Sequence, residues 1–470
     1  MISINKTKRI ILTIIIACQL MVVLDSAIMV TALPEIGRTL HITTANLTWV
    51  QNAYILAFGG LLLLGARAGD ILGRRRMFSV GIALFTLASI LVGFAQSAEF
   101  LLITRAFQGL AAAIATPSTL ALLAVTFVEA KERTKAIALF SAVSGAGGSI
   151  GLILGGILTD LISWRVGMFL NVPIGIAMLI MVPRYLPETE KNTGHFDLMG
   201  ALTSVIGITA LVFGFIQAAA NGWGKLETLL ALSIGVVLLV AFVFIEARAK
   251  QPITPLRLFS SRKRSGAYLG RFLFLCGNFS LFFFVPQFLQ NVLDFTSFES
   301  GLAFLPFTGV MFGMMYLMPW LITRFGNLKV LIAGLIIAII GTSWLSQISA
   351  DSQFFPQIFI PLLIMGMGAG MVFLPFTSFG LSDVDSRDSG AASGLINVAQ
   401  QTGSSLGLAV LITVFEAVNR SAVPSKQHFA HAISVSIMGS AVFITVSLVV
   451  VLVWFLPARK AVQVAARNAA

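Results

Sequence analysis

Long apolar runs recur along the whole of this 470-residue chain, and they restrict its fold more than any other feature. A helix that crosses a membrane needs roughly 20 consecutive apolar residues. Only 11% of the residues are charged, whereas a soluble domain carries about 25%. No stretch is long and polar enough for a soluble domain. The sequence therefore predicts an all-α integral membrane protein.

The apolar runs predict fourteen transmembrane helices, at about 10–33, 48–66, 77–96, 100–127, 136–161, 167–183, 198–219, 228–247, 266–290, 300–322, 329–348, 357–380, 391–414 and 432–456. With the N-terminus inside, this topology leaves 24 of the 31 lysines and arginines in cytoplasmic segments. Because cytoplasmic loops are rich in Lys and Arg, we expect both termini in the cytoplasm and a multi-pass protein of the plasma membrane. The net charge of +12 lies in short loops, so no nucleic-acid partner is expected.

The stretch between the second and third predicted spans places one carboxylate among several arginines. Its glycines and charges of interest are Gly65, Gly69, Asp70, Gly73, Arg74 and Arg75. The three glycines fall four residues apart on one helical face, which lets two spans approach closely. Asp70 can accept charge-assisted hydrogen bonds from the arginines. A basic cytoplasmic loop with one incidental acid is the alternative.

This stretch resembles the loop between spans 2 and 3 of the major facilitator superfamily, whose pattern is G-x-x-x-D-R-x-G-R-R. Ile71 and Leu72 follow Asp70 where the family pattern has its Arg. The resemblance implies a conformational latch built from the six residues named above. It also implies two six-helix bundles related by pseudo-two-fold symmetry, with a substrate site between them.

Two charged side chains inside the predicted spans are candidates for proton coupling. Asp25 lies in a segment, 24–34, that resembles the first-span signature of drug/proton antiporters, and intramembrane acids are usually functional. Arg105 lies in a segment, 101–109, that resembles the fourth-span motif, in which a buried Arg faces the proton path. Since both lie at a similar depth, they can form and break an ion pair. The alternatives are a structural hydrogen bond for Asp25 and snorkelling to the outer surface for Arg105.

The fifth predicted span is rich in glycine. Gly147, Gly151 and Gly155 repeat every four residues, which predicts a close-packing helix face. Together with Gly156 they resemble the antiporter signature G-x8-G-x3-G-P-x2-G-G, although Ala138 and Leu152 replace its first Gly and its Pro. Helix packing alone also explains these glycines.

The segments 164–165 and 169–175 resemble a signature of the fourteen-span drug/proton antiporters. The resemblance implies a six-helix bundle over 1–197, an inserted two-helix hairpin over 198–247, a basic cytoplasmic linker over 248–264 and a second bundle over 265–470. An internal repeat supports two halves, because 323–329 aligns with 70–76 at an offset of 253.

Polar and aromatic side chains within spans are candidates for lining a substrate cavity. They are Tyr54, Gln108, Asn171, Asn278, Phe283, Gln287, Asn397 and Gln401. Arg271, about one turn into the ninth span, is expected to snorkel to the cytoplasm. The second half has no carboxylate in the middle of a span, so we expect neutral or monocationic amphiphiles as substrates.

These features favour a proton-coupled antiporter that exports hydrophobic, neutral or monocationic drugs by alternating access. A lipid or lipid-linked metabolite exporter on the same scaffold is the alternative. An enzyme would need His, Cys or paired acids converging within the spans, and the sequence places one lone acid there. We expect no metal and no cofactor, because the proton gradient would be the energy source. The expected partners are protons, a small amphiphile and the lipid bilayer, and we expect a monomer.

Overall fold

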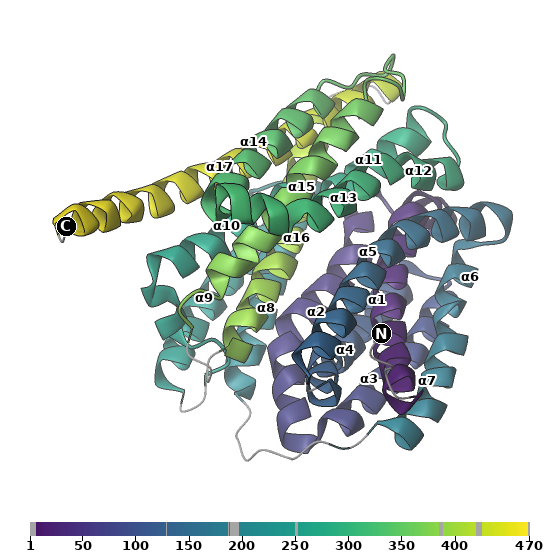
Figure 1. Ribbon diagram of the computed structural model, residues 1–470. Coiled ribbons are helices and arrows are strands. Elements are labelled where there is room, and N and C mark those ends of the chain that lie inside the picture. The colour runs from purple at the N-terminus through teal and green to yellow at the C-terminus, as the bar shows by residue number, and fades with distance from the viewer. Residues whose placement is uncertain are drawn as a thin grey trace. The chain divides into compact units, whose positions relative to one another are not determined.

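The computed structural model describes residues 6–127, 129–186, 188, 197–249, 252–384, 389–419 and 425–468, and every regular element in these ranges is a helix (Figure 1). Part of the expected cytoplasmic segment 184–197 and part of the expected linker 248–264 lie outside the described residues.

The helices are α1 (Lys6–Thr39), α2 (Thr44–Leu72), α3 (Arg74–Gly93), α4 (Ala98–Thr126), α5 (Ala130–Leu161), α6 (Trp164–Phe169), α7 (Asn171–Tyr185), α8 (Leu198–Asn221), α9 (Leu226–Arg248), the 3-10 helix η1 (Leu256–Ser260), α10 (Arg262–Asn278), α11 (Leu281–Asn291), α12 (Ser297–Ala303), α13 (Leu305–Phe325), α14 (Asn327–Leu345), α15 (Phe359–Gly380), α16 (Ser389–Asn419) and α17 (Lys426–Asn468). Side-chain caps begin several of them. The hydroxyls of Thr43 and Ser97, for example, accept a backbone N–H from the first turn of α2 and α4.

Within the described residues, thirteen helices are long and apolar enough to cross a membrane, so the chain is a multi-pass membrane protein. Three of these combine two consecutive helices: α6 with α7, α10 with α11, and α12 with α13. The predicted fifth span, 136–161, lies in α5, in which the described residues Gly147–Leu161 form a shorter apolar stretch.

Three predicted spans are interrupted where the sequence analysis expected continuous helices, and one of them, 167–183, breaks at Leu170 between α6 and α7. Span 266–290 breaks between α10 and α11, where the hydroxyl of Ser280 donates to the carbonyl of Cys276 at 2.8 Å. Such a bond competes with the backbone ladder and bends a helix. Span 300–322 breaks at Phe304, two residues before Pro306, which has no N–H to donate.

The chain divides into two compact units. Unit 1 contains residues 1–207, 249–253 and 294–304. In it α1 packs on α5, α4 packs on both α2 and α3, and α7 lies against α1 and α3 (Figure 1). The short helix α12 also belongs to unit 1, because it packs on α5.

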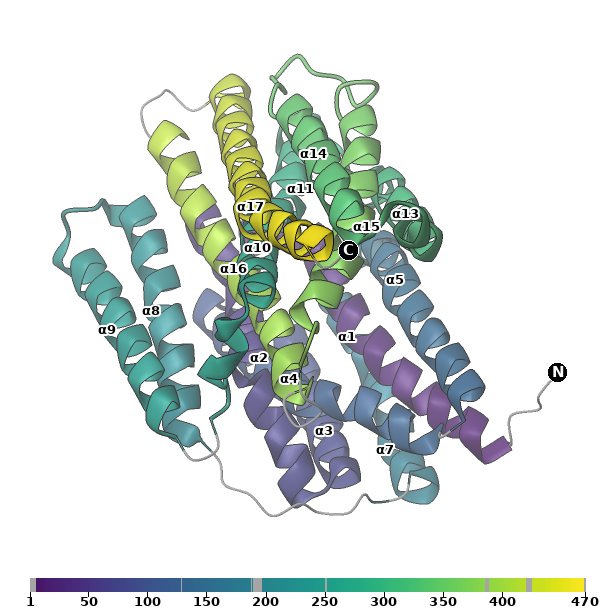
Figure 2. The same cartoon turned by 60° about the vertical axis from the view of Figure 1, so that its left-hand side comes forward.

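Unit 2 contains residues 208–248, 254–293 and 305–470. Here α10 packs against α16 and α17, and α15 packs against α13 and α14. Helices α8 and α9 lie side by side as a hairpin (Figure 2), with Gly214 against Leu232 and Gly235 against Leu211. The hydroxyl of Thr413 on α16 donates to a carbonyl of α8 at 2.8 Å, which fixes the hairpin to that helix.

Candidate functional site

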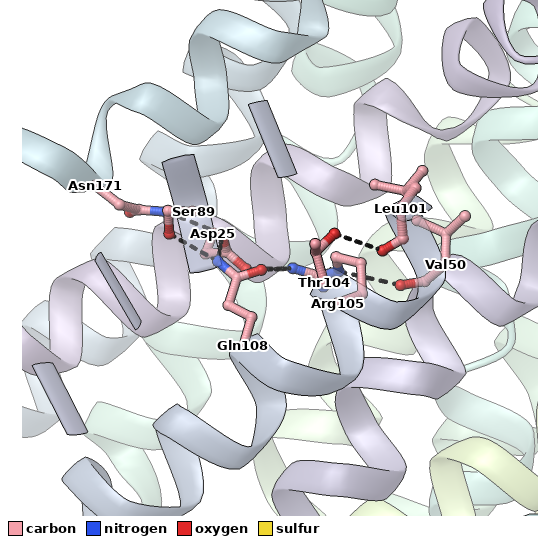
Figure 3. A network of polar contacts seen from close by, with 8 residues as sticks. All are labelled: Asp25, Val50, Ser89, Leu101, Thr104, Arg105, Gln108 and Asn171. Carbon is pink, nitrogen blue, oxygen red and sulfur yellow. Dashed lines mark hydrogen bonds and ion pairs between the residues drawn. The ribbon is translucent and has the colours of Figure 1, made fainter. Parts of the chain in front are cut away.

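Asp25 lies in α1 with no exposed surface, and hydrogen-bond donors from two other helices surround its carboxylate (Figure 3). Its Oδ2 accepts from Nη1 of Arg105 at 2.7 Å. Its Oδ1 accepts from Nε2 of Gln108 at 2.6 Å and from Nδ2 of Asn171 at 2.9 Å. Both carboxylate oxygens are therefore satisfied, as a buried carboxylate requires.

Arg105 on α4 is equally buried and points into the bundle. Its Nη1 also donates to Oε1 of Gln108 at 2.6 Å, and its Nε donates to the carbonyl of Val50 on α2 at 3.1 Å. The guanidinium lies 4.5 Å from the ring centroid of Tyr54, a cation–π contact. The alternative of an arginine that snorkels to the outer surface is wrong, because only 1% of Arg105 is exposed.

Ser89 on α3 completes this network, and the sequence analysis missed it. Its hydroxyl oxygen accepts from Gln108 at 2.9 Å and from Asn171 at 3.2 Å, so it holds both amides in place to face Asp25. The available signal was one of three hydroxyl side chains in the predicted span 77–96, the others being Ser79 and Thr86. Ser and Thr are too common in transmembrane helices for that signal to be specific.

The network joins five helices of unit 1 through one negative and one positive group: α1, α2, α3, α4 and α7. The ionised carboxylate is stabilised by the guanidinium and two amides. A proton on Asp25 would remove the charge that holds Arg105 and would turn one acceptor oxygen into a donor. Protonation of Asp25 would therefore weaken the contacts that join these helices.

The glycines of α5 bring that helix against the part of α1 that carries Asp25. A methyl group on Gly151 would lie 2.6 Å from Cβ of Ala27, and one on Gly155 would lie 2.7 Å from Cα of Ile28. Gly147 faces Leu20 in the same way. Gly156 faces another direction, toward the backbone of α12, where a methyl group would lie 2.5 Å from Cα of Phe298.

The Gly65–Arg76 stretch is mostly helical rather than a loop. Helix α2 continues to Leu72, and only Gly73, with φ +104°, separates it from α3. Gly65 and Gly69 face α4 as the spacing predicted; a methyl group on Gly65 would lie 2.0 Å from the carbonyl oxygen of Ala113. Gly73 is not part of that packing face, because its role is the turn, where its positive φ excludes most side chains.

Asp70 and Arg75 use different partners within this stretch. Oδ1 of Asp70 lies 2.6 Å from Nη2 of Arg74, across the turn. Arg75 instead reaches the segment after α7: its backbone N–H donates to Glu188 at 3.0 Å and its Nη1 donates to the carbonyl of Leu186 at 3.3 Å. The sequence analysis did not single out Glu188, which lies more than 110 residues from Arg75.

The proposed cavity residues divide between the two units. Tyr54, Gln108 and Asn171 all belong to the Asp25 network. In unit 2, Asn278, Phe283 and Gln287 are buried in α10 and α11. On α16, Gln401 is half-buried, whereas Asn397 is exposed and donates to the carbonyl of Ser393.

Arg271 on α10 does not snorkel to the cytoplasm, and that prediction is wrong. The residue is 7% exposed and its guanidinium points between helices. Its Nη1 donates to Thr377 at 2.9 Å and to the carbonyl of Phe373 at 3.3 Å, both on α15. Its Nη2 donates to Oε1 of Gln400 on α16 at 2.6 Å. Polar acceptors on neighbouring helices made the inward orientation available, and a single-span argument cannot see them.

Comparisons with known proteins agree with this fold. A family model described as the Major Facilitator Superfamily matches residues 15–408. The chain is 38% identical over 412 residues to the puromycin resistance protein pur8 of Streptomyces alboniger, covering 86% of this chain and 81% of that protein. It is 37% identical over 417 residues to the cephamycin export protein CmcT of Amycolatopsis lactamdurans, covering 87% and 86%.

Among solved structures, a bacterial homolog of the human lysosomal transporter Spinster, inward-facing and unoccupied, matches with a TM-score of 0.69. The match covers 96% of this chain and 97% of that one at 15% sequence identity, so it supports the fold alone. The family match spans most of the chain, the relatives are similar over nearly their whole length, and the helices form multiple membrane spans. This chain therefore belongs to the Major Facilitator Superfamily, a family of membrane transporters and not of enzymes.

Proposed function

We propose that this protein exports hydrophobic, neutral or monocationic drugs and related amphiphiles in exchange for protons. The observation that carries the proposal is the buried Asp25–Arg105 ion pair, in which one carboxylate faces donors from several helices of unit 1. The names of two relatives, a puromycin resistance protein and a cephamycin export protein, favour drug export. No cofactor or metal is needed in this scheme, because the proton gradient supplies the energy.

In the proposed cycle, Asp25 takes a proton from the outer side and releases Arg105. The loss of this charge pair lets the helices that share the network shift relative to one another, and proton release on the inner side restores the pair. Proton binding can drive the change between the two conformations only if it changes the free energy of one conformation more than that of the other.

The test is transport in proteoliposomes under an imposed pH gradient. Asp25→Asn should abolish proton-driven accumulation of a fluorescent amphiphile while downhill exchange of that compound continues. Glu35→Gln, ten residues further along α1 and partly exposed, is the matched control and should transport like the wild type. Unchanged coupling in Asp25→Asn would exclude this role. A panel that includes labelled lipids distinguishes a lipid exporter, for which drugs would not be transported.

We also propose that Asp70 with Arg74 and Arg75, and the glycines around them, form a latch at the cytoplasmic ends of α2 and α3. The Asp70–Arg74 ion pair is only half-buried, and screening by solvent keeps its contribution to folding stability to about 1 kcal/mol. Asp70→Asn should therefore leave the melting temperature nearly unchanged but slow turnover several-fold, with substrate affinity retained. Exposed Glu227 on α9 provides a control, Glu227→Gln. A full transport rate in Asp70→Asn would refute the latch.

For the architecture, we propose fourteen spans with α5 as the fifth, both termini in the cytoplasm, and a monomer in the plasma membrane. The bundles 1–197 and 265–470 would be related by pseudo-two-fold symmetry and joined by the hairpin 198–247 and the linker 248–264. Two details support this. Gly73 and Gly326, 253 residues apart, both have positive φ between two helices. Gly403 and Gly407 meet α10 much as Gly147 and Gly151 meet α1.

A further inference from the structure

Unit 2 contains a buried arginine, Arg271, that has no carboxylate partner among the described residues. None of the ion pairs between described residues involves Arg271, and its hydrogen-bond acceptors are a carbonyl, a hydroxyl and an amide. Arg105 in unit 1 is buried to a similar degree but is neutralised by Asp25. A buried charge is expensive unless it is paired, and charged groups within spans usually mark a ligand path.

The guanidinium of Arg271 also keeps unused hydrogen-bonding capacity. It carries five N–H donors, and three hydrogen bonds are formed. The Nε–H is buried and has no acceptor among the described residues. Nε and Nη2 lie on one edge of the planar group, which is an edge that carboxylates bind bidentately.

The acceptor now bound to Nη2 is one that an anion can replace. Gln400 is half-buried and uncharged, so its amide can rotate away. The hydrogen bond from Arg271 to Gln400 has one charged partner, and an anionic acceptor would add the attraction between opposite charges, which is strong away from water. An anion bound to Nε and Nη2 would therefore displace Gln400, while Thr377 and Phe373 on α15 keep hold of Nη1.

We propose that Arg271, held by Thr377, forms a binding site for the carboxylate or sulfonate of an amphiphilic organic anion, and that Gln400 occupies this site when no anion is bound. The ring of Phe373, whose centroid is 5.2 Å from the guanidinium carbon, supplies an apolar wall beside the charge. The site widens the substrate range beyond neutral and monocationic compounds. This proposal depends on the proposed export function at one point only, namely that the bound anion is part of a transported compound.

The test compares two fluorescent probes that differ by one group, 1-anilinonaphthalene-8-sulfonate and the uncharged N-phenyl-1-naphthylamine. Binding is measured by equilibrium dialysis on the full chain in zwitterionic nanodiscs, with empty discs subtracted. Arg271→Gln should weaken binding of the sulfonate by at least about tenfold, the size expected for a lost charge-assisted contact, and change binding of the uncharged probe by less than about twofold. Arg324→Gln removes an equal charge from the exposed end of α13 and should change neither.

Two further variants keep the proposal testable if Arg271→Gln fails to fold. Arg271→Lys retains the charge without the planar fork and should lose part of the preference for the sulfonate. Gln400→Leu removes the displaceable acceptor and should leave sulfonate affinity equal to or above the wild type. Equal sulfonate binding by the wild type and both Arg271 variants, or an equal loss for both probes, would show that Arg271 only ties α10 to its neighbours and would overturn the proposal. These readouts use no proton gradient, so failure of proton-driven export leaves them unaffected.

Discussion

Asp25 and Arg105 are tolerated inside the bilayer because each satisfies the other, and the cost of that arrangement appears only when one is removed. Breaking a buried pair by removing a single partner leaves an uncompensated charge and costs about 3–5 kcal/mol. Removing both leaves no such charge. Gln108, which bonds to both partners, would remain to satisfy whatever polar atoms the substitutions leave.

This predicts strong coupling in a double-mutant cycle. Asp25→Asn and Arg105→Gln should each lower the free energy of unfolding by about 3 kcal/mol. The double variant should be destabilised by clearly less than the sum, because the substitutions share one interaction. Thermal or denaturant unfolding in a single detergent measures all four proteins. Additive effects would mean that the 2.7 Å contact carries little interaction energy.

For single residues, the sequence predicted which side chains belong to the site better than it predicted which groups they contact. Asp25, Arg105, Gln108 and Asn171 could be chosen from motifs, and the structure brings all four together. Ser89 could not be chosen, because its role depends on hydrogen bonds from two amide side chains that lie on other helices. The inward direction of Arg271 could not be predicted either, since its acceptors lie on α15 and α16.

Among the elements, α5 and α1 pack closely enough that the glycines between them leave no room for a methyl group. Three glycines spaced by four residues bring the helix axes together beside Asp25, so the position of the acid depends on the absence of side chains on α5. Small-residue faces of this kind let transmembrane helices pack at short distance. The spacing alone predicted the face but not that α1 would be the helix lying on it.

Substitutions on α5 should have different effects at the packed glycine face and at other positions on the same helix. Gly155→Ala places a methyl group 2.7 Å from the backbone of Ile28, which cannot move without shifting α1, and should cost about 1–3 kcal/mol. Gly148→Ala is the control on the same helix, because its methyl group would meet only Val23 at an ordinary 3.9 Å. Melting temperature and transport rate should both fall in the first variant and remain at wild-type values in the second. Equal stability of the two would contradict the packing observed.

For the whole molecule, the membrane topology that the distribution of Lys and Arg predicts can be tested directly. With fourteen spans and both termini inside, a fluorescent protein fused after Ala470 should fluoresce, and alkaline phosphatase fused there should be inactive. Fusions in the 221–225 turn of the α8–α9 hairpin should give the opposite result. An active phosphatase at the C-terminus would require an odd number of spans and would contradict the expected topology.

What the sequence by itself determined follows from local physics. Apolar runs of sufficient length must become helices in lipid, where every backbone polar group needs an internal partner, and an isolated acid in such a run needs a reason to be there. The tertiary structure decided which helices lie beside one another, and hence which donors face Asp25 and which acceptors hold Arg271. Those outcomes depend on contacts between residues 80 or more positions apart, and no periodicity along the chain records them.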